Sequence, residues 1–224
     1  MSVNQQAYTQ LHNELSEKDV TLIAVSKTKP VSDIIELYDL GHRDFGENYV
    51  QELSDKATQL PADIRWHFIG HLQRNKVKFI LPFVHLIHSV DSLRLLLEIE
   101  KQAAKIGRKV SVLLQIYIAG EETKFGLDEM ELNELADYLQ KNPLHHVQIK
   151  GMMGMASFTE DNLVVEKEFT YLRSLYDQYK SMPIPGATFD TLSMGMSGDY
   201  TIAVRQGSNM VRIGSILFGA RQLS

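Results

Sequence analysis

Hydrophobic and polar positions alternate along the chain in two patterns, which together predict repeated strand and helix units. Apolar residues recur at helical spacing over 8–15, and a compact run rich in β-branched residues then covers 20–25. After the polar stretch 26–29, a second helical pattern covers 32–40 and ends at Gly41. The chain is therefore expected to begin with a helix, a buried strand and another helix.

This alternation continues to the end of the chain. Further short apolar stretches, each a strand candidate, cover 44–45, 65–69, 84–88, 110–117, 147–152, 188–192 and 210–213. The clearest amphipathic segments between them are 91–106, 128–140 and 162–182. Apolar strands separated by helices are typical of a parallel sheet covered on its outside. Together with the strand at 20–25, these units predict an α/β protein, a single (β/α)₈ TIM barrel preceded by an extra N-terminal helix.

The alternative architecture is an open, doubly wound sheet. Such a sheet usually carries a glycine-rich loop after its first strand, whereas 26–30 here reads Ser-Lys-Thr-Lys-Pro. We find no linker, low-complexity tract or internal repeat, so we expect residues 1–224 to form one domain.

Composition narrows the class of protein. Apolar residues make up 44% and charged residues 23%, as in ordinary globular proteins. The formal net charge of −5 disfavours binding to nucleic acid or to anionic lipid. The absence of cysteine excludes disulfides, thiolate nucleophiles and cysteine-based zinc sites. Because the first residues are polar and no apolar run reaches about 18 residues, we expect no membrane span and a cytoplasmic location.

Lys27 directly follows the first predicted strand, where functional groups of a (β/α)₈ barrel are found. Strand alternation places Ile23, Val25 and Lys27 on one face, so the amine is expected at the mouth of the barrel. An amine there could attack an aldehyde. Lys29 falls on the same face if the chain stays extended. The alternative is that both lysines are solvated loop residues.

Two glycine- and serine-containing loops follow the last two predicted strands. One contains Ser197, and the other contains Gly214 and Ser215. Loops after strands seven and eight commonly bind phosphate in this fold, because glycines let backbone N–H groups approach and hydroxyls add donors. A helix beginning near Ser215 would direct its positive end at the anion. Ordinary turns are the alternative.

Two further side chains are candidates for contact with a ligand. Arg212, in the last strand, could hydrogen-bond a pyridine nitrogen, or it could form a surface ion pair. Asn48 follows the second strand and either faces a ligand or caps the next helix. We interpret His67 and His71 as core or rim residues, because a zinc site would need three or four convergent ligands. Lys124 is either another cation at the rim of the barrel or a solvated loop residue.

Six segments, in order along almost the whole chain, resemble one known family. They are 24–30, 45–49, 66–70, Lys124-x-Gly126, 192–197 and 211–214. The sequence is similar to the pyridoxal phosphate homeostasis proteins, also called proline synthetase co-transcribed homologues. The resemblance implies binding of pyridoxal 5′-phosphate (PLP) in a barrel similar to the N-terminal domain of alanine racemase.

The resemblance also implies roles for individual residues. Lys27 would form the internal aldimine, Asn48 would lie beside the cofactor, and Arg212 would face the pyridine nitrogen. Ser197, Gly214 and Ser215 would hold the phosphate. Met194, within the 192–197 motif, completes our set of candidate cofactor-binding residues. Two departures from the family pattern, His71 and Arg74, fall at the rim of the barrel.

The same resemblance implies a regulator of PLP supply that is not an enzyme, with PLP-dependent apo-enzymes as possible recipients. Arg212 favours this view, because a protonated guanidinium cannot take up a ring proton. Two-base racemisation would also need a second domain, for which the chain has no residues left. We expect a monomeric, non-catalytic PLP carrier. The alternatives are a small racemase or lyase of the same fold, and a barrel that binds another phosphorylated metabolite without covalent chemistry.

Overall fold

The computed structural model describes residues 3–120 and 125–219, in which eight parallel strands close into a barrel. Each strand pairs with the next along the chain, and the last pairs with the first, with Ile23 opposite Arg212. The closed sheet confirms the barrel and excludes the open-sheet alternative. The strands are β1 (Thr21–Val25), β2 (Asp44–Glu47), β3 (Arg65–Phe68), β4 (Leu86–Val90), β5 (Val110–Ile116), β6 (Val147–Gly154), β7 (Ala187–Met196) and β8 (Met210–Ile213).

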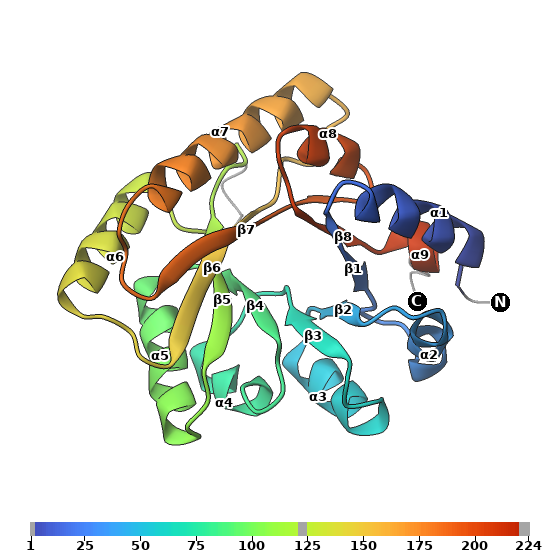
Figure 1. The fold of residues 1–224 in the computed structure, drawn as a ribbon, viewed down its shortest axis with the longest axis horizontal. Helices are drawn as coiled ribbons and strands as arrows, with labels where there is room; N and C mark the ends of the chain where they lie inside the picture. Colours follow the sequence, from blue (N-terminus) through green and yellow to red (C-terminus); the bar gives the residue numbers. More distant parts are fainter. Residues whose placement is uncertain (1–2, 121–124, 220–224) are drawn as a thin grey trace.

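Helices surround the strands, as Figure 1 shows. They are α1 (Gln5–Ser16), α2 (Val31–Asp39), α3 (Val50–Gln59), the 3₁₀ turn η1 (Arg74–Lys76), α4 (Val77–Ile80), α5 (Leu93–Lys105), α6 (Glu129–Lys141), α7 (Asn162–Lys180), α8 (Tyr200–Arg205) and α9 (Ser215–Phe218). The first precedes β1, which confirms the extra N-terminal helix. None of the helices within 3–120 and 125–219 combines the length and apolar character needed to cross a membrane.

Two strands differ most from their predicted bounds. The fourth begins at Leu86, two residues later than expected, because the backbone N–H of Val84 still bonds the carbonyl of Ile80 at the end of α4. The seventh runs on to Met196 through residues interpreted as a loop. Its polar Ser193 is fully buried inside the barrel, where it bonds Arg212. The end of this strand was missed because a polar residue there was interpreted as part of a loop.

The barrel has two apolar layers. The larger one lies between strands and helices and includes Leu22 and Ala24, which alternate with Ile23 along β1. The smaller one fills the interior and is made by Ile23, Leu86, Leu113, Met153 and Met210. Ile23 therefore points inward, as alternation predicted, and β1 directs its carboxyl end toward the mouth of the barrel.

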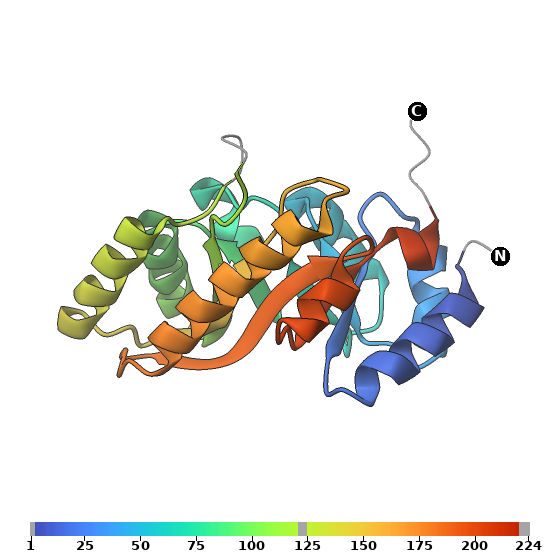
Figure 2. The ribbon, with the colours of Figure 1, turned by 90° about the horizontal axis from the view of Figure 1, so that it is seen from above.

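Helices α1 and α9 lie side by side, so the two ends of the described chain meet (Figures 1 and 2). The backbone N–H of Asn4 bonds the carbonyl of Leu217 at 2.8 Å, and the Asn4 side chain caps α1 through the N–H of Ala7. This packing covers the seam where β8 pairs with β1.

Candidate functional site

A cavity of about 600 Å³ opens at the carboxyl ends of the strands. Residues that follow β1, β2, β3, β6, β7 and β8 contribute to it. The sequence candidates among its walls are Lys27, Asn48, Ser197, Arg212, Gly214 and Ser215. Its volume falls within the range of small-molecule and cofactor sites. Six of the seven candidate cofactor-binding residues therefore line one cavity.

The backbone around Lys27 is held on both sides. Ser26 donates its hydroxyl to Glu47 Oε1 at 2.6 Å, and the N–H of Thr28 donates to Glu52 Oε1 at 2.6 Å. Thr28 has a φ of 62°, in the left-handed region, and the N–H of Lys29 bonds the carbonyl of Ser26 at 3.0 Å. The chain therefore turns directly at Lys27 and does not stay extended to Lys29.

Lys56 organises the buried charges beneath this turn. Its Nζ lies 2.8 Å from the Ser26 carbonyl and 2.7 Å from both Glu47 Oε1 and Glu52 Oε1. Glu47 is fully buried and Lys56 is 5% exposed. Burial raises the pKa of Glu47 despite the attraction of Lys56. The ion pair thus anchors the segment that carries Lys27.

The two predicted anion-binding loops contact each other. The N–H of Gly214 donates to the Ser197 hydroxyl at 3.2 Å, and α9 begins at Ser215, as predicted. Because α9 has only four residues, its dipole contributes little, and the available donors are backbone N–H groups and the two hydroxyls. Gly195, near the end of β7, has a φ of 99°, and a Cβ there would lie 2.6 Å from Ala203 Cβ, so glycine is required just before the Ser197 loop.

Arg212 is 4% exposed and points from β8 into the barrel. Its Nη1 donates to the Ser193 carbonyl at 2.9 Å and hydroxyl at 2.6 Å, and its Nη2 donates to the Gly154 carbonyl at 2.9 Å. Burial lowers the pKa of Arg212 to about 10, which leaves the guanidinium charged at neutral pH. A surface ion pair is therefore excluded as its role.

Asn48 does not cap the following helix. The residue before α3 is Tyr49, and no side-chain cap hydrogen bond is present there. Asn48 Oδ1 is buried, and no hydrogen-bond partner is found for it within 3–120 and 125–219. Since a buried amide oxygen normally has a partner, this side chain is suited to a ligand in the cavity.

The remaining candidates lie elsewhere. The Met194 side chain is fully buried in the outer core and is not among the described cavity walls. Lys124 lies outside the described residues. His71 stacks on Phe125, with ring centroids 4.1 Å apart, and contacts Asp91 at the rim. Arg74 begins the exposed turn η1.

Sequence reasoning missed the loop after β6, whose residues 155–159 also line the cavity. Their position could have indicated this role, because these residues directly follow the end of a strand, as Lys27 does. Lys29 reaches the cavity as well, but its Nζ donates to the carbonyl of Phe218 at 2.7 Å. Its ammonium is thus hydrogen-bonded to the last residue of α9.

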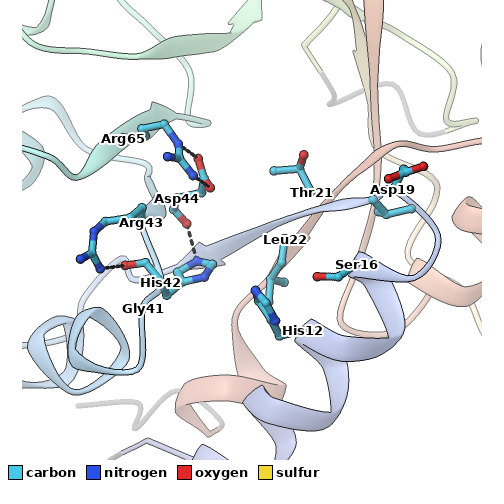
Figure 3. Close-up of a pocket in the computed structure, with 11 residues that line it drawn as sticks. His12, Ser16, Asp19, Thr21, Leu22, Gly41, His42, Arg43, Asp44 and Arg65 are labelled. Carbon is cyan, nitrogen blue, oxygen red and sulfur yellow. Dashed lines mark hydrogen bonds and ion pairs between the residues drawn. The ribbon is translucent and has the colours of Figure 1, made fainter.

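A second depression, of about 410 Å³, lies at the amino ends of the strands (Figure 3). Its cations are paired, since Arg65 bonds Asp44 and Arg43 Nε bonds Asp63 at 2.7 Å. This end of a (β/α)₈ barrel generally serves stability, so we assign the binding site to the larger cavity.

Comparison with known proteins now connects this geometry with a family. Residues 5–222 match the model of the alanine racemase N-terminal domain. The chain is also 40% identical over 211 residues to the pyridoxal phosphate homeostasis protein of Pasteurella multocida, with 93% of this chain and 89% of that protein covered. The chain belongs to the pyridoxal phosphate homeostasis protein family. The Escherichia coli member is 38% identical over 93% of this chain and 89% of its own length.

Solved structures agree with membership in the pyridoxal phosphate homeostasis protein family. PipY of Synechococcus elongatus, solved with PLP bound, is 35% identical with a TM-score of 0.86, covering 96% of this chain and 99% of its own. The PLP-free PipY structure has a TM-score of 0.88. Alanine racemase from Bartonella henselae shares the fold at 17% identity and a TM-score of 0.70, and 60% of its chain is covered.

Proposed function

We propose that this chain binds PLP covalently through Lys27 and acts as a PLP carrier in cofactor homeostasis. The observation that carries the proposal is the convergence, in one cavity, of Lys27, the Ser197 and Gly214 loops and Arg212. The names of the relatives and the PLP in PipY support the choice of ligand.

The residues present fit PLP chemically. Ser197, Gly214 and Ser215 would hold the phosphate with hydroxyl and backbone donors. Arg212 would donate to the ring nitrogen, and Asn48 Oδ1, which has no partner within the described part of the chain, offers an acceptor beside the ring. When bound, PLP supplies an aldehyde that reacts with an amine and a ring that can withdraw electrons from a substrate.

The surroundings of the cavity favour carriage over catalysis. Arg212 stays protonated and can only donate, so it cannot take up a proton from the ring. Besides Lys27, Lys29 and Arg212, the charged residue that lines the cavity within 3–120 and 125–219 is Asp199, whose Oδ1 accepts a hydrogen bond from the N–H of Met196 at 2.5 Å. Lys29, the other amine in the walls, already donates to Phe218. Both of these acid–base candidates, Lys29 and Asp199, are thus already engaged in hydrogen bonds within the protein.

Borohydride trapping tests the attachment. PLP-loaded protein is reduced, digested and analysed by mass spectrometry, and we expect the pyridoxyl group on Lys27. Lys29→Met should keep this adduct, whereas Lys27→Ala should lose it. An adduct of equal yield in Lys27→Ala would refute the assignment.

Hydrogen exchange at substrates tests the carrier role. PLP-loaded protein is incubated with single amino acids in D₂O, and we expect no α-deuterium above that formed by free PLP. Steady exchange that disappears in Lys27→Ala would indicate a racemase or lyase. The proposal also includes a single domain over 1–224 and a monomeric chain in the cytoplasm. It further includes delivery of PLP to apo-enzymes, which is tested by mixing the PLP-loaded protein with an apo-enzyme and measuring the activity that the enzyme gains.

A further inference from the structure

A row of hydrogen-bonded polar side chains crosses the barrel interior and ends at Arg212. Asp44 Oδ1 lies 3.1 Å from His67 Nε2, and His67 Nδ1 lies 3.0 Å from His88 Nε2. His88 Nδ1 is 3.2 Å from the Ser193 hydroxyl, which is 2.6 Å from Arg212 Nη1. The row thus links the amino-end depression with the wall of the larger cavity.

These groups come from five strands, β2, β3, β4, β7 and β8, and they are almost entirely shielded from water. His88 and Ser193 are 0% exposed and His67 is 1% exposed. Polar groups in such positions are costly unless they are hydrogen-bonded. The row therefore has to satisfy its own donors and acceptors.

The chemistry of each group fixes the direction of every bond. Arg212 can only donate, so the Ser193 hydroxyl accepts from it and gives its single proton to His88 Nδ1. His88 then carries its proton on Nε2 and donates to His67 Nδ1. His67 in turn carries its proton on Nε2 and donates to Asp44.

The reverse direction fails at Asp44. It would direct the bare Nε2 of a neutral His67 at an ionised carboxylate. Although burial alone would raise the pKa of Asp44, hydrogen bonds from His67 and Arg65 hold it below its usual range. Figure 3 shows Arg65 bonded to Asp44 at the edge of the depression, with Nε 2.6 Å from Oδ1. The carboxylate therefore stays ionised and orients the row.

The two imidazoles stay neutral because they are buried. Desolvation lowers the pKa of His67 and lowers that of His88 well below its ordinary value. The charged or titratable groups that face them are Asp44, Arg65, Arg212 and the neighbouring imidazole of His85.

We infer that Asp44, His67, His88 and Ser193 form a one-directional hydrogen-bond relay that positions Arg212, with both imidazoles neutral and protonated on Nε2. Ser193 occupies one edge of the guanidinium through Nη1, while Arg212 also lines the larger cavity. These four are positioning residues. Their effect on PLP rests on the proposed function, but the tautomers of the relay do not.

The first experiment needs no ligand. The full chain is labelled with ¹⁵N, freed of any bound PLP with hydroxylamine, and studied by long-range ¹H–¹⁵N correlation between pH 7 and 8. Both imidazoles should show protonated Nε2 and bare Nδ1 throughout, with assignments from His67→Gln and His88→Gln. A proton on Nδ1 of either ring, or protonation of either ring within this range, would overturn the inference even if PLP binds.

The second experiment removes the link to Arg212. Ser193→Ala should turn His88 into a tautomer mixture, shift the visible absorption of bound PLP and weaken PLP binding about tenfold, as expected for one lost hydrogen bond. Ser193→Thr should restore all three, because it keeps the hydroxyl. If Ser193→Ala changes neither tautomer nor affinity, the relay does not position Arg212. Failure of wild-type protein to bind PLP would refute the proposed function and leave the tautomer test intact.

Discussion

Replacing Lys56 by methionine should destabilise the protein strongly, in a way that depends on pH. Lys56→Met keeps most of the side-chain volume but removes the ammonium that lies 2.7 Å from Glu47 Oε1. At an effective dielectric constant of about 20, attraction across that distance is about 6 kcal/mol before desolvation is subtracted. Breaking a buried pair typically costs about 3–5 kcal/mol.

Protonation of Glu47 limits this loss. In the variant the folded pKa of Glu47 rises further, while the unfolded value stays near 4.5. Keeping the carboxyl neutral at pH 7 then costs about 3.4 kcal/mol, since each of the roughly 2.5 pH units contributes about 1.36 kcal/mol. A group with a raised folded pKa loses its stabilising effect as pH rises. The difference from wild type should therefore shrink to about 1 kcal/mol near pH 5.

Urea unfolding followed by circular dichroism at pH 5, 7 and 8 measures this loss. The matched control is Lys18→Met, which breaks the exposed Lys18–Glu14 pair and should cost less than about 1 kcal/mol at every pH. Adding Glu47→Gln to Lys56→Met should recover at least half of the loss at pH 7. A loss equal to that of the control, or equal at pH 5 and pH 8, would refute this account.

Two further substitutions test other parts of the structure. Gly70→Ala would place a Cβ 2.1 Å from the backbone oxygen of Asn48. It should therefore lower the free energy of unfolding in urea by about 1–3 kcal/mol and weaken PLP binding. The control, Gly120→Ala, has open space around the new Cβ and should change the free energy of unfolding by less than about 0.5 kcal/mol. Burial lowers the pKa of His42 to about 4, so its contribution to stability is complete above about pH 6.5 and falls by roughly 3 kcal/mol as pH drops to 4. His42→Phe should flatten the pH dependence of unfolding in this range, and an unchanged slope would show that His42 is not held neutral.

Much of the fold was predictable because strands and helices here differ in apolar periodicity. The last strand was predicted at its observed bounds, 210–213, since its apolar run is compact and flanked by turn residues. Lys27 and the Ser197 and Gly214 loops were found by one rule, that polar residues directly after strands line the mouth of a barrel. That rule places Lys27 at the end of β1 without any knowledge of its contacts.

The contacts between distant strands could not be predicted in this way. Ser193 and His88 are 105 residues apart, and nothing local to either indicates that the other lies 3.2 Å away. His67 was interpreted as a core or rim residue and lies in the core, but that interpretation did not reveal its hydrogen-bond partners. Thr28 likewise carries no local sign of its left-handed backbone, which depends on Glu52 from α3.

Pairing of β8 with β1 has a consequence for biosynthesis. Lys27 leaves the ribosome long before Gly214 and Ser215, which line the same cavity and follow β8, the strand that pairs with β1. Closing contacts between the two ends of a chain is slow and requires the final strand to be available. A nascent chain that has already made Lys27 therefore lacks the anion-binding loops, and the capacity to capture the cofactor arises only in the step that closes the barrel.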